Sequence, residues 1–592
     1  MKNMMLPIVL LLLLAITPAF SQTFMDHVKA THGDTLVIKD QVDESGNANA
    51  LFTVLNGDSA SVPAGRVYEL QANGIYPLQN NPNMWANRTT VLVGSDPTPL
   101  VNNKNALSAP PLVCGFVGAS VNMASFGGSG SFIGRNIALT PCASDGSENW
   151  AYHGSGSAHQ RIEYDNCLFE HTRWIMVAAF NDSCTFVLRN DYFVNLNGQP
   201  CRRNGGVYDG FNVLDTFLVE NCTHINSQGS MYKWRNYPAN RIIINHNTFV
   251  NNAGYQFMDL GYQSHASYTN NLFVNSNDQA FSGIQTIDPG EADVDFLPMG
   301  LVNMYADSAD NANLTKRKFL VDDNLAYWDP IWSNLIDTLN TLHVDGVTAW
   351  KSNQITMNTR TTTMFSDNAT YPYLTNGKWY TEKPLFTDSK NLQTTGLWAL
   401  KKYVVQVADT GSTAVLPDWR LVNTGAANYV YFDWPIPVDL SYSNATLLTG
   451  AAGASGRFPV GDINWFPTQK ASWLAQRTAE YTKIQTALDA GTALDGVKEQ
   501  SNVTPGDFSL NQNYPNPFNP STTISFVLPS SAKTSLEVYN LLGQKVATLM
   551  NGFTSAGYHE VQFNAAHLAS GVYVYRLTSG TFTSVKKLML VK

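Results

Sequence analysis

The chain has 592 residues, of which 44% are hydrophobic, and its formal net charge at pH 7 is −9. A chain of this length and composition buries a large core and is expected to form two or three domains. The charge is uneven, since the last 82 residues carry +4 and the preceding 510 carry −13. An acidic body argues against nucleic acid and strongly polyanionic substrates as partners.

The first 21 residues have the pattern of a secretory signal peptide. Lys2 precedes an apolar run from Leu6 to Ile16, and Ser21 offers a small residue for cleavage before Gln22. The run is too short to span a membrane, and no later segment is long and apolar enough to do so. We therefore expect an exported protein without a transmembrane segment.

A short pattern recurs between residues 160 and 273. Its copies begin at Arg161, Thr185, Thr216, Arg241 and Ala266, and their polar corners fall at Asn166, Asn190, Asn221, His246 and Asn270. The steps between corners are 24, 31, 25 and 24 residues. Two short strands in a repeat of this length indicate a solenoid, because the period is too short for a βαβ unit. We predict a right-handed parallel β-helix over residues 22–345.

The corner residues have a structural interpretation. Asn tolerates the bent backbone of a turn, and its amide can hydrogen-bond to the equivalent amide one coil away. Coils in such a stack lie about 4.8 Å apart, so a ladder of amides satisfies polar groups along the axis. We interpret the five corner residues as a structural ladder.

The six cysteines lie between Cys114 and Cys222. Export permits disulfides, but Cys167 and Cys222 share one column two coils apart, which is beyond the reach of a disulfide. We expect most of the cysteines to be small buried residues. Because no Cys/His cluster has the spacing of a metal site, no metal is predicted.

Further runs extend the repeat in both directions. Arg66–Leu70 and Thr89–Gly94 are strand runs that resemble the opening coils of pectate-lyase-like β-helix proteins. Residues 346–490 continue the body with irregular loops, and the runs 435–442 and 458–465 resemble the closing segment of pectate-lyase-like surface proteins of the Bacteroidetes. A helix over residues 468–489 is expected to cap the open end, and residues 491–510 read as a polar linker.

The tail, residues 511–592, alternates short apolar strands with Gly and Asn turns, which predicts an antiparallel β-sandwich. Its motifs in order are Asn513–Pro520, Thr522–Leu528, Leu536–Gln544, Leu568–Tyr573 and Lys586–Leu590. This series resembles the C-terminal sorting domain of type IX secretion substrates. The resemblance implies export to the cell surface or beyond by the type IX machinery, with a sortase-like peptidase cutting in the linker near residues 499–507.

The nearest match to a catalytic group is Tyr232-Lys233-Trp234-Arg235, with Arg202-Arg203 one coil earlier. The β-helix resemblance implies a polysaccharide lyase, in which Lys or Arg removes the proton α to a uronate carboxylate and Ca²⁺ balances the developing charge. Lys233 and Arg235 are the candidate bases, while Tyr232, Trp234, Arg202 and Arg203 are candidate sugar contacts. No acidic cluster has the spacing of a calcium site, so Ca²⁺ is implied only under the lyase hypothesis.

The competing hypothesis is a non-catalytic surface protein that binds carbohydrate, adheres or builds a cell coat. Trp85, Trp150, Trp174 and Trp234 are candidates for stacking on sugars or for filling the core. A hydrolase needs clustered Asp residues around a Gly-His turn, which the sequence does not contain. We therefore predict a glycan-binding or structural surface protein without a cofactor, and a uronate lyase is the alternative.

Overall fold

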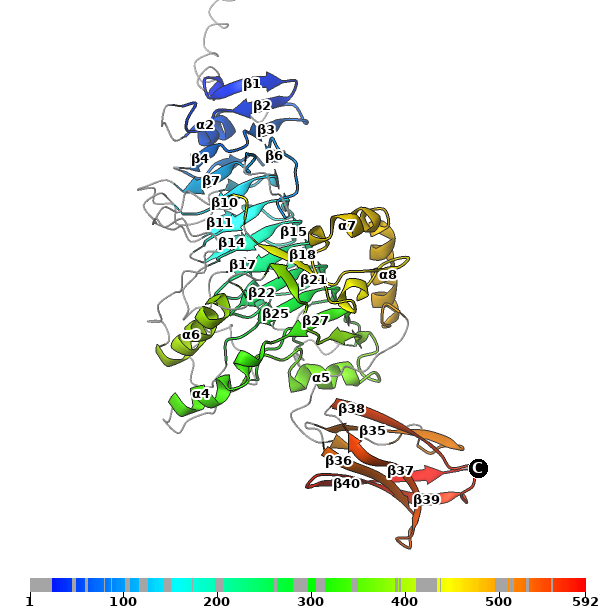
Figure 1. Cartoon of the computed structure of the whole chain (residues 1–592). Helices are drawn as coiled ribbons and strands as arrows, with labels where there is room; N and C mark the ends of the chain where they lie inside the picture. Colours follow the sequence, from blue (N-terminus) through cyan, green and yellow to red (C-terminus); the bar gives the residue numbers. More distant parts are fainter. Residues whose placement is uncertain are drawn as a thin grey trace, which may run out of the picture. The chain divides into compact units, whose positions relative to one another are not determined.

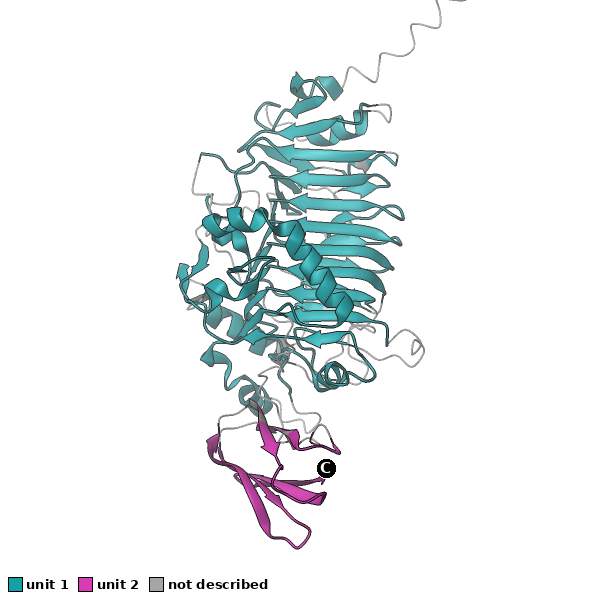
Figure 2. Ribbon diagram, turned by 90° about the vertical axis from the view of Figure 1, so that its right-hand side faces the viewer, with its two compact units in different colours: residues 1–498 teal, residues 499–592 magenta. Residues whose placement is uncertain are grey.

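The computed structural model describes most of the chain in two compact units, residues 1–498 and 499–592 (Figures 1 and 2). The described residues are 24–44, 49–58, 62–78, 80–86, 88–101, 107–115, 126–142, 151–172, 174–196, 206–235, 237–259, 263–280, 297–304, 315–342, 350–388, 392, 395–410, 434–436, 438–495, 509–510, 513, 516–528, 532–554 and 557–591. The expected signal peptide and the expected cleavage region lie outside them. No described helix is long and apolar enough to cross a membrane.

The first unit contains three long sheets whose neighbouring strands are parallel, except for the antiparallel pair at one end. The 12-stranded sheet has the order β1 (Val28–His32), β2 (Thr35–Ile38), β3 (Val67–Leu70), β6 (Thr89–Gly94), β9 (Ser131–Arg135), β12 (Arg161–Asp165), β15 (Cys184–Arg189), β18 (Leu214–Glu220), β21 (Ala239–Asn245), β24 (His265–Thr269), β26 (Lys318–Asp322), β28 (Leu374–Asn376). The 10-stranded sheet contains β4 (Ile75–Leu78), β7 (Leu112–Gly115), β10 (Ala138–Thr140), β13 (Leu168–Glu170), β16 (Tyr192–Val194), β19 (Thr223–Ile225), β22 (Thr248–Asn252), β25 (Leu272–Ser276), β27 (Asn324–Tyr327) and β29 (Trp379–Tyr380). The five-stranded sheet contains β11 (Ala151–Gly154), β14 (Ile175–Ala179), β17 (Gly206–Gly210), β20 (Tyr232–Arg235) and β23 (Phe257–Asp259).

The chain visits the three sheets in a fixed order. Each of the five circuits from β9 to β23 adds one strand to the 12-stranded sheet, then one to the 10-stranded sheet, then one to the five-stranded sheet, as in β12–β13–β14 and β15–β16–β17. Arg161 pairs with Thr185, Thr185 with Thr216, and Thr216 with Arg241. This pairing confirms the alignment of the repeats that the sequence predicts.

The interior of the circuits holds most of the core. Inward positions of the 12-stranded sheet stack Ile162, Phe186, Phe217 and Ile242, all at most 1% exposed. The 10-stranded sheet contributes a column of nearly parallel rings, with centroids 4.2–4.9 Å apart: Phe169, Phe193, His224, Phe249 and Phe273. Like residues stack in successive circuits because the strands are parallel and in register.

Described helices lie at the two ends of this unit, along one corner and against one further side. The described helices are α2 (Ala50–Gly57), η3 (Pro330–Trp332), α4 (Leu335–Leu342), α5 (Thr359–Ser366), α6 (Thr395–Thr410), η5 (Leu447–Thr449), η6 (Ile463–Trp465), α7 (Pro467–Leu474) and α8 (Arg477–Ala490). The described short strand pairs are β5 (Asn83–Met84) with β8 (Gly127–Gly128), β30 (Phe386–Asp388) with β31 (Asp439–Tyr442), and β32 (Ala451–Ala452) with β33 (Arg457–Phe458). Leu51 and Val54 of α2 and Phe365 of α5 join the core. These two helices close the ends of the stack (Figure 1).

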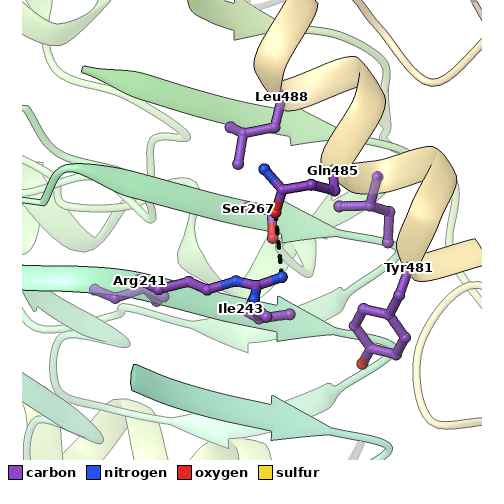
Figure 3. Close-up of a pocket in the computed structure, with 8 residues that line it drawn as sticks. Arg241, Ile243, Ser267, Tyr481, Gln485 and Leu488 are labelled. Carbon is purple, nitrogen blue, oxygen red and sulfur yellow. Dashed lines mark hydrogen bonds between the residues drawn. The ribbon is translucent and has the colours of Figure 1, made fainter. Parts of the chain in front are cut away.

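We call residues 438–495 the C-terminal clamp, because they lie along the corner between the 12- and 10-stranded sheets. Its helix α8 contacts β24 and β26 and crosses the outer face of the 12-stranded sheet (Figure 2). Figure 3 shows Tyr481, Gln485 and Leu488 facing the strands, with Arg241 Nη2 donating to Gln485 Oε1 at 3.1 Å. The cavity between them is only ≈ 10 Å³. The predicted helix therefore exists as α7 and α8, but it covers a face and a corner of the stack, while α5 covers the end.

The second unit is an antiparallel sandwich. One sheet has the order β34 (Ser509–Leu510), β35 (Ser521–Leu528), β38 (Gly557–Asn564), and the other β37 (Lys545–Thr554), β36 (Ala532–Tyr539), β39 (Gly571–Ser579), β40 (Phe582–Leu590). Alternate residues of each strand, such as Leu536 and Val538 in β36, face a shared core. This period of two is what the sequence of the tail predicts.

Candidate functional site

Four of the six candidate bases and sugar contacts from the sequence lie on β20 of the five-stranded sheet. Tyr232 and Trp234 point into the core, where they are 0% and 1% exposed and stack on each other at 5.9 Å. Lys233 and Arg235 alternate with them and point outward, but Lys233 is also 0% exposed. A ring buried in the core cannot stack on a ligand. Of these four residues, only Arg235 is partly exposed; Arg202 and Arg203 lie outside the described residues.

Arg235 is held by a buried carboxylate on the neighbouring strand. Its Nε and Nη2 donate to the two oxygens of Asp209 at 2.7 and 2.8 Å. Trp174 Nε1 also donates to Asp209 Oδ2, at 3.0 Å. Asp209 is fully buried, so this paired arrangement fixes both the guanidinium and the indole ring.

The five corner residues adopt the left-handed conformation that the turn requires. Their φ angles lie between 52° and 60°: Asn166, Asn190, Asn221, His246 and Asn270. Within the described part of this column, one direct bond joins amides, from Asn166 Nδ2 to Asn136 Oδ1 at 2.9 Å. The longer run of amide-to-amide bonds lies one position later, where Asn247 donates to Asn271 at 3.0 Å and Asn271 to Asn324 at 2.9 Å.

Two acids that precede the candidate bases in the sequence, Asp209 and Glu220, lie on different sheets and do not meet each other. Asp209 faces outward from the five-stranded sheet, while Glu220 belongs to the 12-stranded sheet and pairs with Arg477 of the clamp at 2.6 Å. Among the described residues, no group of three or more His, Cys, Asp or Glu side chains is placed to hold a metal ion. Five cysteines are described, and all are buried; Cys114, Cys167, Cys184 and Cys222 form no disulfide, and Cys201 lies outside the described residues.

An open groove lies at the corner between the five- and 12-stranded sheets, on the circuits nearest the N-terminus of the unit. Its cavity volume is ≈ 680 Å³, and its lining comes from the segments that precede β3, β6, β9 and β12 and from the starts of these strands. The polar lining residues are Arg66, Tyr68, Arg88, Thr89, Ser129, Ser131, Ser157, His159 and Gln160. A groove of this size suits a small molecule or a short stretch of a polymer.

A hydrogen-bonded network sets the charge of the groove. Arg66 Nε donates to Asp58 Oδ2 at 3.0 Å, and Tyr68 Oη donates to the same oxygen at 2.8 Å. Arg88 Nη2 donates to Tyr68 Oη at 3.0 Å. Burial, and then the Asp58 carboxylate, raises the pKa of Tyr68, so this hydroxyl stays protonated. Arg66 thus contacts the Asp58 carboxylate directly, while Arg88 is linked to it through the Tyr68 hydroxyl.

Close packing of turns shapes the far wall of the groove. Gly156 would place a Cβ 2.0 Å from the carbonyl oxygen of Gly128, so only glycine fits there. Ser157 Oγ donates to the Ser129 carbonyl at 2.8 Å, and the Gln160 amide donates to the Gly130 carbonyl at 2.5 Å. His159 follows with φ of +60° and is exposed at the groove's rim.

Aromatic rings continue the same corner in the next circuits. We call Trp174, Phe180, Phe211 and Arg235 the aromatic platform. Phe180 and Phe211 stack at 5.6 Å with an interplanar angle of 13°, and the guanidinium of Arg235 lies 5.0 Å from the Phe211 ring. Trp174 lies 5.7 Å from Phe211. All four residues are partly buried.

The groove and the platform are joined by backbone contacts. Ser155 Oγ accepts hydrogen bonds from the N–H groups of Phe180 and Asn181 at 2.8 and 3.1 Å. His159 N donates to the Asp182 carbonyl at 3.0 Å. The last turn of the groove therefore lies directly against the first turn of the platform. Sequence reasoning named Trp174 and Arg235 but not Arg66, Arg88, His159, Phe180 or Phe211, because no motif connects these separate turns.

Comparison with known proteins identifies the family of the tail. No curated protein matches the chain. Residues 512–592 match the family model of the secretion system C-terminal sorting domain, which confirms the resemblance seen in the tail sequence. The protein is therefore a type IX secretion substrate, exported to the cell surface or beyond it, and its C-terminal unit belongs to the sorting-domain family.

Proposed function

We propose that the first unit is a pectin-lyase-like, right-handed parallel β-helix that binds carbohydrate at or outside the cell surface. The circuit through three parallel sheets supports the solenoid, and parallel crossovers are right-handed in nearly all proteins. The open groove is the observation that carries the binding role. On this proposal the sorting domain delivers the unit, a sortase removes the tail, and the groove then adheres to a surface or extracellular glycan.

The chemistry of the groove matches a sugar ligand. Sugars offer many hydroxyl groups, which need both donors and acceptors, and the lining supplies serine and threonine hydroxyls, an exposed histidine and two guanidiniums. Arg66 and Arg88 are already oriented by the Asp58–Tyr68 network, so little conformational entropy is lost on binding.

The test measures retention of the full chain in gels containing alginate, polygalacturonate, starch, xylan or cellulose. We expect retention on one of these polysaccharides, and the affinity for it should be roughly tenfold lower in Arg88→Ala. This factor corresponds to the free energy of one charge-assisted hydrogen bond. Arg135→Ala is the matched control, because Arg135 is an exposed arginine on the 12-stranded sheet outside the groove. No retention on any polysaccharide, or equal loss in both variants, would remove carbohydrate binding by the groove.

A uronate lyase is the second candidate, favoured by Asp209, Lys233 and Arg235 sharing the outer face of the five-stranded sheet. Its Ca²⁺ would need acids beyond the described residues. The test incubates the full chain with alginate and polygalacturonate, with and without Ca²⁺, and records the ultraviolet absorbance of unsaturated products. Absorbance that disappears in Lys233→Ala or Arg235→Ala would establish the lyase; silence in the wild type would exclude it for these substrates.

A further inference from the structure

The aromatic platform is unusual because its rings lie outside the sheets. In a stack of this kind the large apolar side chains fill the interior, as Phe186 and Phe217 do, and the outer faces need no aromatic groups. Here Phe180 and Phe211 instead begin the outer turns after β14 and β17, and Trp174 lies beside them. The fully buried Asp209 anchors Trp174 and Arg235 beside these rings. Asp209 is thus a buried, charged residue that fixes partly exposed side chains in place, as is typical of a rigid binding surface.

We propose that this platform is a stacking subsite for an uncharged sugar ring, and that the ligand is an extended glycan running along the stack from the groove to the platform. This inference rests on the proposed function and names its ligand as a polymer longer than the groove. The C–H face of a sugar ring is apolar and weakly positive, and it complements the negative face of an aromatic ring.

The direction of the chain follows from the register. Gly154 pairs with Ala178, and Ser155 Oγ accepts a hydrogen bond from the N–H of Phe180, so the turn that contains Gly156 lies beside Phe180. Gly156 has no side chain to cover the ring, and the close contact with Gly128 excludes one. The groove side of Phe180 is therefore the place at which a ligand leaving the groove meets the platform.

The platform favours a neutral unit. The charge of Arg235 is balanced by its two-point contact with Asp209, and Phe180 and Phe211 bring no charge. Successive circuits are about 4.8 Å apart, close to the length of one sugar in an extended chain, so the platform's three circuits match a few consecutive sugars.

The experiment uses oligosaccharide ladders, from disaccharide to decasaccharide, prepared from alginate and from xylan. Affinity for the full chain is measured by calorimetry for the wild type and for Phe211→Leu, which keeps an apolar side chain of similar volume but removes the aromatic face. Trp398→Leu is the matched control, because Trp398 is an aromatic residue on α6 that is 65% exposed and outside the platform.

The expected result is that short oligosaccharides bind wild type and Phe211→Leu equally, while long xylan oligosaccharides, whose units are uncharged, bind the wild type roughly tenfold more tightly than the variant. Alginate oligosaccharides, whose units are all charged, should show no such difference. Trp398→Leu should keep this gain with length. Long ligands should quench the tryptophan fluorescence of the wild type, and this quenching should be lost in Trp174→Phe. This variant tests the Trp174 ring independently of Phe211.

An identical gain with length in wild type and Phe211→Leu would overturn the platform and leave the groove intact. An affinity that does not increase with oligosaccharide length would also overturn the platform, because the ligand would then use no second subsite. Absence of binding by every oligosaccharide would instead defeat the proposed function, and this inference with it. Thermal unfolding of each variant distinguishes these outcomes from misfolding.

Discussion

Two corners of the first unit are built from the same repeating turns but differ in what covers them. At the corner between the 12- and 10-stranded sheets, the left-handed residues Asn221, His246 and Asn270 are buried against the C-terminal clamp. At the corner between the five- and 12-stranded sheets, the turns form the groove and the platform, which are open or half-open. We call them the closed corner and the open corner.

The closed corner shows how buried polar groups are satisfied. Glu480 of α8 is fully buried; it accepts hydrogen bonds from Asn245 at 2.9 Å and Trp473 at 2.8 Å and lies 3.2 Å from His246. Burial raises the pKa of Glu480, but His246 and these hydrogen bonds lower it more, so the net shift is downward. Each of these four side chains thus has a partner within the unit, and none of the four is left to face a ligand.

At the open corner, side chains are not fully covered by other parts of the protein. Its guanidiniums, hydroxyls and rings are oriented by the protein but keep faces toward solvent. The difference teaches that rows of polar residues on a solenoid are not by themselves a binding site. The residues of the closed corner are the more regular in sequence, but the less regular open corner is the one that can receive a ligand.

Removing the carboxylate of the closed corner should have the largest effect. Glu480→Ala leaves the His246, Asn245 and Trp473 donors buried without their acceptor, and should reduce the free energy of unfolding of the first unit by about 3–5 kcal/mol. Differential scanning calorimetry measures this as a lower midpoint of the unit's transition. Asp489→Ala, on the exposed side of the same helix, is the control. An unchanged midpoint in Glu480→Ala would show that the clamp contributes little.

A second effect of the closed corner is a pH dependence. Burial raises the pKa of Asp462 to about 7, although hydrogen bonds from Thr223 and Asn464 lower it in part. Because the folded pKa is above the unfolded value, this group's contribution to stability is complete below about pH 4 and is lost as pH rises through 7. Each pKa unit corresponds to about 1.36 kcal/mol, so the upper bound is about 4 kcal/mol.

The measurement for Asp462 compares unfolding midpoints at pH 5 and pH 8. The wild type should lose more stability over this interval than Asp462→Asn, which cannot ionise and keeps an oxygen acceptor for Thr223. Asp489→Asn, at an exposed carboxylate, should behave as the wild type. Equal losses in wild type and Asp462→Asn would place the titrating group elsewhere.

The amide ladder beneath the closed corner should have a smaller effect. Asn271 Oδ1 accepts from the backbone N–H of Asn247 at 3.0 Å, and its Nδ2 donates to the Ile244 carbonyl at 2.9 Å. Asn271→Leu preserves volume but leaves these groups unpaired, and should cost about 1–3 kcal/mol in chemical unfolding. The exposed turn residue Asn368 is the matched position for a control Asn→Leu change.

Much of the closed corner was predictable from the sequence, because its signal is local and periodic. The repeats that begin at Arg161, Thr185, Thr216 and Arg241 pair as aligned, and their corners are left-handed. The amide ladder was expected at the corner itself, where Asn166 does donate to Asn136. Asn270 instead donates to Asn245 on the strand before the corner. The following residue, such as Asn271, is the one that faces the next circuit.

The open corner and the clamp were not predictable, because their contacts join distant parts of the chain. Arg66, Arg88 and His159 reach one groove from three circuits without a common motif. The pairing of His246 with Glu480 spans 234 residues. One missed feature did have a signal: alternation along β20 puts Tyr232 and Trp234 on one face, which identifies them as core residues rather than sugar contacts.

The smallest expected effect, and the sharpest comparison, comes from two histidines in the same left-handed conformation. His246 at the closed corner has φ of +57° and is buried against Glu480, while His159 at the open corner has φ of +60° and is exposed. Asn tolerates this conformation, so His→Asn tests the side-chain contacts and not the backbone. His246→Asn should lower the free energy of unfolding by about 1–2 kcal/mol through loss of its buried partner, whereas His159→Asn should stay within about 0.5 kcal/mol. Parallel urea titrations give both values, and retention of His159→Asn on the polysaccharide that binds the wild type adds the second readout.

The comparison holds if His159→Asn weakens binding at unchanged stability. Equal destabilisation by the two substitutions would mean that both corners serve the fold alone.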